Sequence, residues 1–184
     1  MGRAVNRLDA DLVMAACNGD VDSFRELFNR HQKLALGLAR SLLPDSHLAE
    51  DAVQEAFAIV CQNLWSLRDG SRFPQWLGTI VRNCARKLSK SQGKTRELVA
   101  EPIAPSNDLT STQSKLDAAL AQLPESAREV IHLHYFSELS YDQIAQVLST
   151  SPQAVHGRLQ RARRALLELL TKSETYEVKN ERTA

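Results

Sequence analysis

The 184-residue chain is poor in the residues and runs that mark sheets and membrane spans. Aromatic residues make up 5% of it, and no run of alternating β-branched residues occurs, so a β-sheet is not expected. No stretch approaches the ~20 apolar residues of a transmembrane helix, and the N-terminus lacks the apolar segment of a signal peptide. The sequence predicts an all-α, cytoplasmic protein without membrane insertion.

Cysteine is also scarce. Cys17, Cys61 and Cys84 are odd in number and far apart, and none has a second Cys or His at ligand spacing. This pattern argues against a disulfide framework and a zinc site, and we expect buried, reduced thiols. No nucleophile with a neighbouring base and no phosphate-binding loop emerges either, so we expect neither an enzyme nor a cofactor. The scattered histidines are expected to be surface or core residues.

Charge is present but unevenly distributed, although the formal net charge is only +1. Seven Lys or Arg residues and no acid lie between Arg72 and Arg96. The stretch from Asp45 to Glu55 holds four acids and no Lys or Arg. We therefore expect separate basic and acidic surfaces that serve separate partners.

Apolar residues recur at helical spacing in two blocks. In the first, helices are expected over 9–17, 20–42 and 46–64 and from Pro74 onward. Composition from Ser91 to Thr112 is that of a linker, and helices resume near Gln113, Pro124, Tyr141 and Pro152. We expect two small helical domains, over 9–92 and 113–172, a flexible linker over 93–112 and a polar tail over 173–184.

The second block ends in the pattern of a helix-turn-helix. Ser140 and Gln143 fit a capping box, a turn of about three residues follows, and Ser151 with Pro152 marks the next helix. One face of that helix is an apolar stripe, formed by Val155, Leu159, Ala162, Leu166 and Leu169. The opposite face is rich in arginine, whose planar fork can pair with guanine edges or phosphate in the major groove. The alternative is a plain helical hairpin with a solvated basic face.

The basic stretch after residue 71 is of another kind. It combines aromatic, amide and cationic groups, a mixture that suits single-stranded nucleic acid because rings stack on bases and cations follow the backbone. Its members are Phe73, Trp76, Asn83, Arg86, Lys87 and Lys90. The alternative is that Phe73 and Trp76 belong to the core.

Three segments together resemble a known family. "DAVQEAFAIVCQNLW", "RFPQWLGTIVRNCARKL" and "LPESAREVIHLHYFSELSYDQIAQVLSTSPQAVHGRLQRARRAL" are similar, in order and spacing, to bacterial RNA polymerase sigma factors of the extracytoplasmic function (ECF) group of the sigma-70 family. The resemblance spans roughly Asp9 to Leu170. It implies a sigma-2-like bundle that binds core polymerase and melts the −10 element, and a sigma-4-like helix-turn-helix that reads the −35 element as duplex.

The resemblance also assigns roles to residues. It places Asp51, Gln54, Glu55 and Phe57 in the helix that docks on the β′ clamp helices of the polymerase. The −10 element would be held by Arg72, Phe73, Asn83, Arg86, Lys87 and Lys90. The −35 element would be read by Gln153, His156, Gly157, Arg158, Gln160, Arg161 and Arg164. The implied partners are core polymerase, including its β flap, promoter DNA and an anti-sigma factor.

Two departures from the family pattern and one rival interpretation accompany this resemblance. Ser149 stands in the turn where the family often has glycine, and His156 with Gly157 stands where it often has Lys-Ser. Without the resemblance, the acidic edge at Asp51 and Glu55 is a solvated face. The rival is a stand-alone helix-turn-helix regulator whose N-terminal helices dimerise or sense a signal, and it leaves the acidic helix and the amide-bearing basic helix unexplained.

Overall fold

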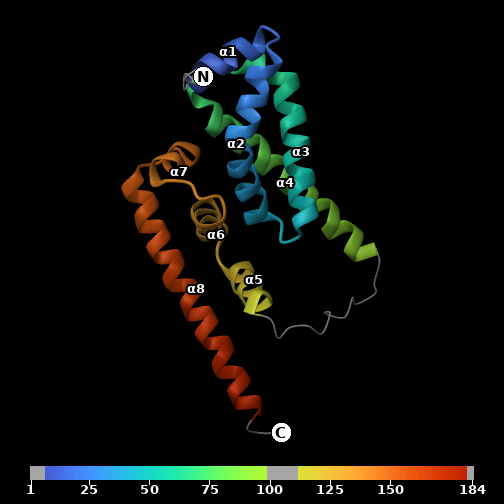
Figure 1. The fold of residues 1–184 in the computed structure, drawn as a ribbon. Helices are drawn as coiled ribbons and strands as arrows, with labels where there is room; N and C mark the ends of the chain where they lie inside the picture. Colours follow the sequence, from blue (N-terminus) through green and yellow to red (C-terminus); the bar gives the residue numbers. More distant parts are fainter. Residues whose placement is uncertain (1–6, 99–111, 182–184) are drawn as a thin grey trace, which may run out of the picture.

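The computed structural model describes residues 7–98 and 112–181, with side chains for 7–91 and 115–172, and all regular structure in these ranges is helical (Figure 1). The all-α expectation is confirmed. The N-terminal domain consists of α1 (Asp9–Cys17), α2 (Val21–Leu42), α3 (Ser46–Asn63), η1 (Leu64–Ser66), η2 (Gly70–Arg72) and α4 (Phe73–Leu98). The C-terminal domain consists of α5 (Thr112–Gln122), α6 (Glu125–Ile131), η3 (His132–Phe136), α7 (Tyr141–Leu148) and α8 (Pro152–Glu181). None of the helices in the described ranges has the length and apolar character that a membrane span requires.

Side-chain caps explain where the N-terminal helices begin. Asp20 accepts hydrogen bonds from the backbone N–H groups of Asp22 and Ser23 and so caps α2. Asp45 caps α3 in the same way, one residue before the expected start. Gly19 connects α1 to α2 with φ +91°, a conformation that glycine adopts without steric cost.

Two helices run past their expected ends. α4 continues to Leu98, well beyond the expected end near Ser91. α8 continues to Glu181, through most of the segment expected to be a tail. The rest of the predicted linker, 99–111, lies outside the described residues. Between α6 and α7 the chain forms the π-helical turn η3, which the sequence pattern did not predict.

The N-terminal domain packs its helices around fully buried aliphatic side chains. The largest of these are Leu12, Leu27, Leu38, Val60, Leu77 and Val81. Of the three cysteines only Cys84 is buried, and its burial raises the pKa of the thiol. Cys17 and Cys61 are exposed, so the expectation of three buried thiols is wrong for those two. Both lie near helix ends or on outward faces, where apolar periodicity does not require burial.

The apolar core does not stop at the end of the N-terminal domain. The cluster around α2 and α4 continues through Leu133, Ile144 and Val147 into the C-terminal domain, and α2 contacts both α6 and η3 (Figure 1). A second, smaller cluster lies within the C-terminal domain, around Val130 and Leu159. The two domains are therefore packed against each other in a closed arrangement.

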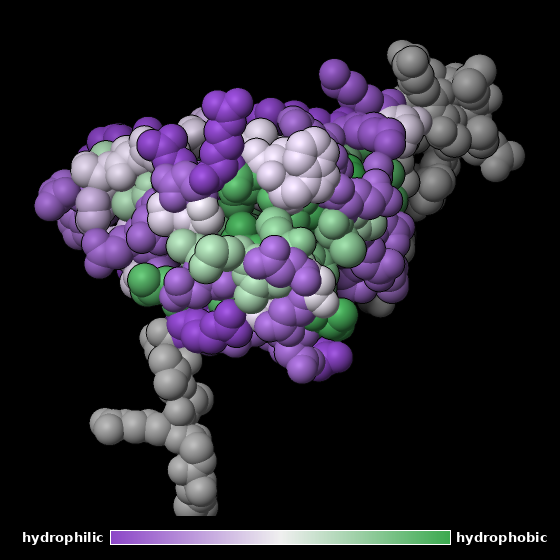
Figure 2. Space-filling view, turned by 90° about the horizontal axis from the view of Figure 1, so that it is seen from above, coloured by the Kyte–Doolittle hydropathy of each residue, from purple (hydrophilic) through white to green (hydrophobic). Residues whose placement is uncertain are grey.

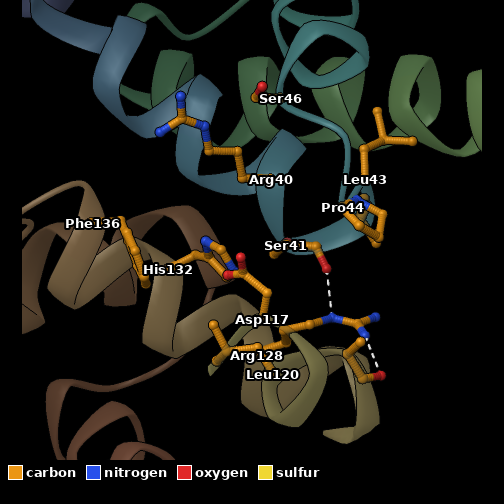
Figure 3. A pocket seen from close by; sticks show the side chains of 12 residues that line it. Arg40, Ser41, Leu43, Pro44, Ser46, Asp117, Leu120, Arg128, His132 and Phe136 are labelled. Carbon is orange, nitrogen blue, oxygen red and sulfur yellow. Dashed lines mark hydrogen bonds between the residues drawn. The ribbon is translucent and has the colours of Figure 1, made fainter. Parts of the chain in front are cut away.

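A cavity of about 250 Å³ marks the edge of this contact (Figure 3). Arg128 of α6 spans the junction, because its Nε donates to the Ser41 carbonyl at 2.7 Å and its Nη1 to the Ala121 carbonyl at 2.9 Å. His132 forms part of the cavity wall, and its Nδ1 has no hydrogen-bond partner within the described residues. Burial, with Arg128 and Arg40 nearby and only Asp117 opposing them, lowers the pKa of His132 to about 4.

The outer surface also carries apolar residues. Seen from the α1 end, hydrophobic side chains gather near the middle of the face with hydrophilic ones around them (Figure 2). Large apolar side chains that the N-terminal domain exposes are Leu8, Met14, Val21 and Trp65. None of these four residues belongs to either of the two apolar clusters.

The buried imidazole should make stability depend on pH. The unfolded chain protonates His132 near its ordinary pKa of 6.5, whereas the folded chain resists protonation down to about 4. This difference in pKa contributes about 3 kcal/mol to the free energy of unfolding. The contribution is fully present above pH 6.5 and is lost as the pH falls towards 4. We expect the thermal midpoint, followed by circular dichroism, to fall more steeply from pH 7 to pH 4.5 in the parent than in His132→Gln.

The matched control is His47→Gln, because His47 is exposed on α3. In that variant the thermal midpoint should change with pH as steeply as in the parent. Parallel curves for the parent and His132→Gln would show that His132 is not held neutral in the folded chain.

Candidate nucleic-acid interface

The helix-turn-helix forms as the sequence predicts. The Ser140 hydroxyl accepts from the N–H of Gln143, and the Gln143 side chain accepts from the N–H of Ser140 at 2.8 Å, which completes the capping box. Ser149 ends α7 in the left-handed region, at φ 50°. Ser151 caps α8, since its hydroxyl accepts from the N–H of Ala154 at 3.2 Å. Local side chains thus fix both the turn and the start of the second helix.

α8 presents the expected two faces. Val155, Leu159 and Ala162 are buried, which confirms the inward stripe. On the outward face Gly157 and Arg158 are half-buried, whereas the exposed members are Gln153, His156, Gln160, Arg161 and Arg164. This face offers amide, imidazole and guanidinium groups along one side of a single helix.

Two side chains of this face are joined to each other. The amide of Gln160 lies 2.9 Å from Nε2 of His156, and the His156 ring meets the edge of Tyr141 at 5.6 Å between centroids. Arg163 points elsewhere, with its guanidinium over the ring of Tyr135 at 5.3 Å. The His156 and Gln160 groups are therefore held in place before any ligand binds, and Arg163 is separate from them.

The second candidate surface lies on η2 and α4. Asn83 and Lys90 are exposed, and neither has a hydrogen-bond partner within the described ranges. Arg72 is also exposed and lies 3.5 Å from Asp69. The remaining cations expected here, Arg86 and Lys87, both bind carboxylates.

These carboxylates come from two domains. Lys87 contacts Glu55 of α3 at 2.8 Å, and this hydrogen bond raises the pKa of Lys87. Arg86 contacts Glu125 of α6 at 2.7 Å. Arg82, another cation of the same basic stretch, forms an ion pair with Glu129 at 2.8 Å, and only 19% and 15% of the two side chains are exposed. The C-terminal domain thus covers part of the basic face of α4.

Phe73 does not fit its expected role. It is fully buried, with its ring 5.1 Å from that of His31 and 6.3 Å from that of Trp76. A ring enclosed in this way cannot stack on a base, so the core interpretation is correct for Phe73. Trp76 is half-buried and packs against the same core.

Phe57 is likewise a core residue rather than a surface contact. Its ring packs on that of Phe28 at 4.6 Å, and 6% of the residue is exposed. It fixes the orientation of α3, whose acidic edge then faces outward. Asp51 and Gln54 are exposed there, whereas Glu55 is half-buried and paired with Lys87.

Each of the two domains matches a known protein family. Residues 27–95 match Sigma-70 region 2, and residues 113–166 match Sigma-70 region 4. The chain is 32% identical over 164 residues to RNA polymerase sigma factor CarQ of Myxococcus xanthus, with 85% of this chain and 94% of that protein covered. The chain belongs to the sigma-70 family, as an ECF sigma factor.

Other relatives agree. The ECF sigma factor SigW of Bacillus subtilis is 27% identical over 170 residues, covering 83% of this sigma factor and 91% of SigW. The solved structure of CnrH in complex with the cytosolic domain of CnrY matches with a TM-score of 0.63 and 30% identity, covering 89% of this chain and 97% of CnrH. RpoE of Bartonella quintana, solved with the anti-sigma factor NepR, matches with a TM-score of 0.58 and 26% identity, covering 82% and 98%. Sigma factors are regulatory subunits of RNA polymerase rather than enzymes, and they act with it in the cytoplasm.

Sequence reasoning missed the acids of α6 in this sigma factor. Glu125 and Glu129 are one turn apart, as are Arg82 and Arg86, and the two pairs meet in opposite chain directions. The matching spacing of four residues was a usable signal, although a spacing alone does not show which helices meet. Gly37, in the middle of α2, was a second overlooked signal.

Ser149 offers a test of the helix-turn-helix geometry in this sigma factor. A left-handed conformation costs a residue with a Cβ about 1–2 kcal/mol, and glycine avoids this cost but loses more chain entropy on folding. We expect Ser149→Gly to raise the free energy of unfolding by about 0.5–1 kcal/mol. Urea unfolding followed by circular dichroism measures the change.

Ser149→Val is the matched variant with the opposite expected effect, because a β-branched residue is least suited to positive φ. It should lower stability. If Val is tolerated as well as Gly, residue 149 is not held in the left-handed region.

Proposed function

We propose that this sigma factor directs promoter-specific initiation by core RNA polymerase, with α8 reading the −35 duplex and α4 with η2 holding the melted −10 strand. The observation that carries the proposal is the coexistence, in two separate domains, of a recognition helix with an outward basic face and a second basic face that carries an exposed amide. Duplex binding needs only the first of these. A protein that also opens DNA needs the second.

The −35 contact follows from the chemistry of α8. Arginine can pair bidentately with the O6 and N7 atoms of guanine, and glutamine with adenine, in the major groove. Arg161, Arg164, Gln153 and Gln160 are exposed and supply these groups. Gly157 has open space around it except for the Arg161 guanidinium, so the backbone of α8 can approach DNA closely at this point.

The −10 contact relies on Asn83 and the cations beside it. An amide offers both a donor and an acceptor to the edge of an unstacked base. Arg86, Lys87, Lys90 and Arg72 would hold the phosphates on either side. Because Phe73 is buried, stacking by its ring has no part in this proposal.

Core polymerase would bind two other surfaces. Asp51 and Gln54 on the outward edge of α3 fit a contact with the β′ clamp helices, which the family resemblance implies. An apolar hollow of about 240 Å³ between η3 and α8, lined by Tyr135, Leu166, Leu167 and Leu170 among others, is suited to an apolar segment such as the β flap. An anti-sigma factor is a further proposed partner, supported by the complexes in which CnrH and RpoE were solved.

Transcription by purified core polymerase with and without this chain tests the proposal. The promoter would be selected from random DNA by the reconstituted holoenzyme. We expect initiation at defined sites only when both components are present. Sequence-specific binding of a palindrome by the chain alone, without any effect on core, would instead support a dimeric helix-turn-helix regulator.

The clamp contact makes a sharper prediction. Asp51 is exposed, so Asp51→Arg should leave the fold intact while placing a cation where an acidic edge meets polymerase. We expect affinity for core, measured by fluorescence anisotropy of the labelled chain, to fall at least tenfold. Asp22→Arg in α2 makes the same charge change at another exposed acid, away from both proposed polymerase contacts, and should bind core as the parent does. Equal affinity of Asp51→Arg and the parent would remove Asp51 from the interface.

The recognition helix α8 gives a further prediction. Arg161→Ala and Arg164→Ala remove outward groups without touching the apolar stripe. Each should weaken binding of −35 duplex by about 1–3 kcal/mol where a bidentate base contact is lost, or reduce the salt slope by about 1 where a phosphate contact is lost. Titrations of duplex at several salt concentrations distinguish the two effects.

Arg163→Ala is the matched control, because that guanidinium lies over Tyr135 rather than on the outward face. It should leave both affinity and salt slope unchanged. If all three variants behave alike, the outward face of α8 is not the reading surface.

A further inference from the structure

We propose that His156 is a positioning residue, which holds the amide of Gln160 in the orientation that binds adenine and rejects guanine at one base pair of the −35 element. This inference rests on the proposed function and adds to it the source of specificity at that base pair. The reading group is then a pair of side chains on α8 rather than a single amide.

The hydrogen bond between these two side chains has only one possible direction. Nε2 of Gln160 lies 2.9 Å from Nε2 of His156. An amide nitrogen carries two N–H donors and accepts nothing, so the imidazole nitrogen is the acceptor and the ring proton lies on Nδ1. The two residues are four apart and are therefore neighbours on one side of the helix. The amide of Gln160 is thus fastened through one of its two N–H groups.

The imidazole of His156 is itself held in place. The ring of Tyr141, the first residue of α7, lies edge-on to it at 5.6 Å between centroids and 5.2 Å from the ring of His134. Tyr141 is half-buried and packs against both apolar clusters. The capping box at Ser140 fixes the start of α7 and with it the place of Tyr141. The acceptor nitrogen therefore has a position that the helix-turn-helix itself determines.

The part of the amide that stays available carries a donor beside an acceptor. Gln160 is exposed, and its Oε1 atom and second N–H are not used by His156. Adenine presents an N7 acceptor and an N6 donor in the major groove, which match this pair. Guanine presents two acceptors, N7 and O6, so Oε1 would face another acceptor. A free amide could turn its NH2 group towards guanine, but the bond to His156 opposes that turn.

Two neighbouring positions of α8 support this assignment. A Cβ on Gly157 would meet only the Arg161 guanidinium, at 3.6 Å, so no side chain there keeps the helix away from the bases. Gln153 is a second exposed glutamine on the same face, and the structure gives it no side-chain hydrogen bond among the residues it describes. Its amide turns freely and is the natural comparison. A side chain that is ordered beforehand loses less entropy on binding than a free one.

Competition binding by the reconstituted holoenzyme, with each −35 base pair of the selected promoter varied in turn, tests the reading role. Gln160→Ala should lower the preference for adenine over guanine at one position by at least about fivefold and leave the other positions unchanged. Replacing that adenine with 7-deazaadenine, which lacks N7, should weaken binding by the parent but not by Gln160→Ala. Gln153→Ala is the matched control and should keep the parent preference at this position.

Two variants of His156 separate positioning from charge. Lysine donates but cannot accept, whereas glutamine offers an oxygen that accepts the same N–H. We expect His156→Lys to lower the preference for adenine about two- to tenfold and His156→Gln to retain it. The charge of lysine attracts both promoters alike, so it does not change their ratio. In the Gln160→Ala background neither variant should alter the preference further, because His156 acts through Gln160.

The outcomes separate the inference from the proposed function. If the parent chain does not support initiation with core, the proposed function fails. If the parent initiates but prefers adenine at no −35 position, or if Gln160→Ala or His156→Lys keeps the parent preference, the proposed function stands and the inference is overturned. Loss of the preference at one position in both variants, with recovery in His156→Gln, supports both.

Discussion

The closed arrangement depends on the absence of a side chain at residue 37. α2 and the segment after η3 approach so closely that Cβ of Ser137 would lie 3.3 Å from a Cβ on Gly37. Because the backbones meet there, Leu133 can enter the cluster formed by α2 and α4, and Arg128 can reach the end of α2. A larger residue at position 37 would disturb all of these contacts together, since they share one rigid helix.

The closed arrangement also accounts for the charge distribution along the chain. A nucleic-acid-binding chain with a formal net charge of only +1 carries its cations and acids on separate segments. In the closed arrangement those segments face each other. Glu55 pairs with Lys87 within one domain, and two acids of α6 pair with two arginines of α4 between the domains. Without the C-terminal domain, Arg82 and Arg86 would lose their partner carboxylates, whereas Lys87 would keep Glu55. Near-neutrality overall is thus compatible with strong local attraction for DNA.

Features that depend on nearby residues could be predicted from the sequence. The capping box at Ser140, the cap at Ser151 and the inward stripe of α8 rest on spacings of three or four residues, and the structure has them all. The positions of Phe73 and Phe57 could not be decided in this way, because an aromatic residue beside charged residues fits a core and a contact surface equally well. Their burial depends on His31 and Phe28, which belong to another helix.

The contact between the domains was beyond prediction for a related reason. Helical periodicity places Arg82 on the polar side of α4, but it does not show that another helix covers that side. Two signals pointed to it: Gly37, a glycine that the amphipathic pattern of α2 does not require, and the matching four-residue spacing of the cations of α4 and the acids of α6. A single small residue fits several explanations until the opposite surface is known.

The ion pairs between the two domains differ in solvent exposure, and this difference limits how far salt can weaken the contact. Lys33 with Glu138 and Arg86 with Glu125 are half exposed or more, so salt screens them and each contributes little. Arg82 with Glu129 is mostly buried, and removing one partner leaves a charge without compensation. Raising the ionic strength therefore weakens the exposed ion pairs more than the buried one. Loss of this contact would leave Arg82 without a counter-charge unless another anion replaced Glu129.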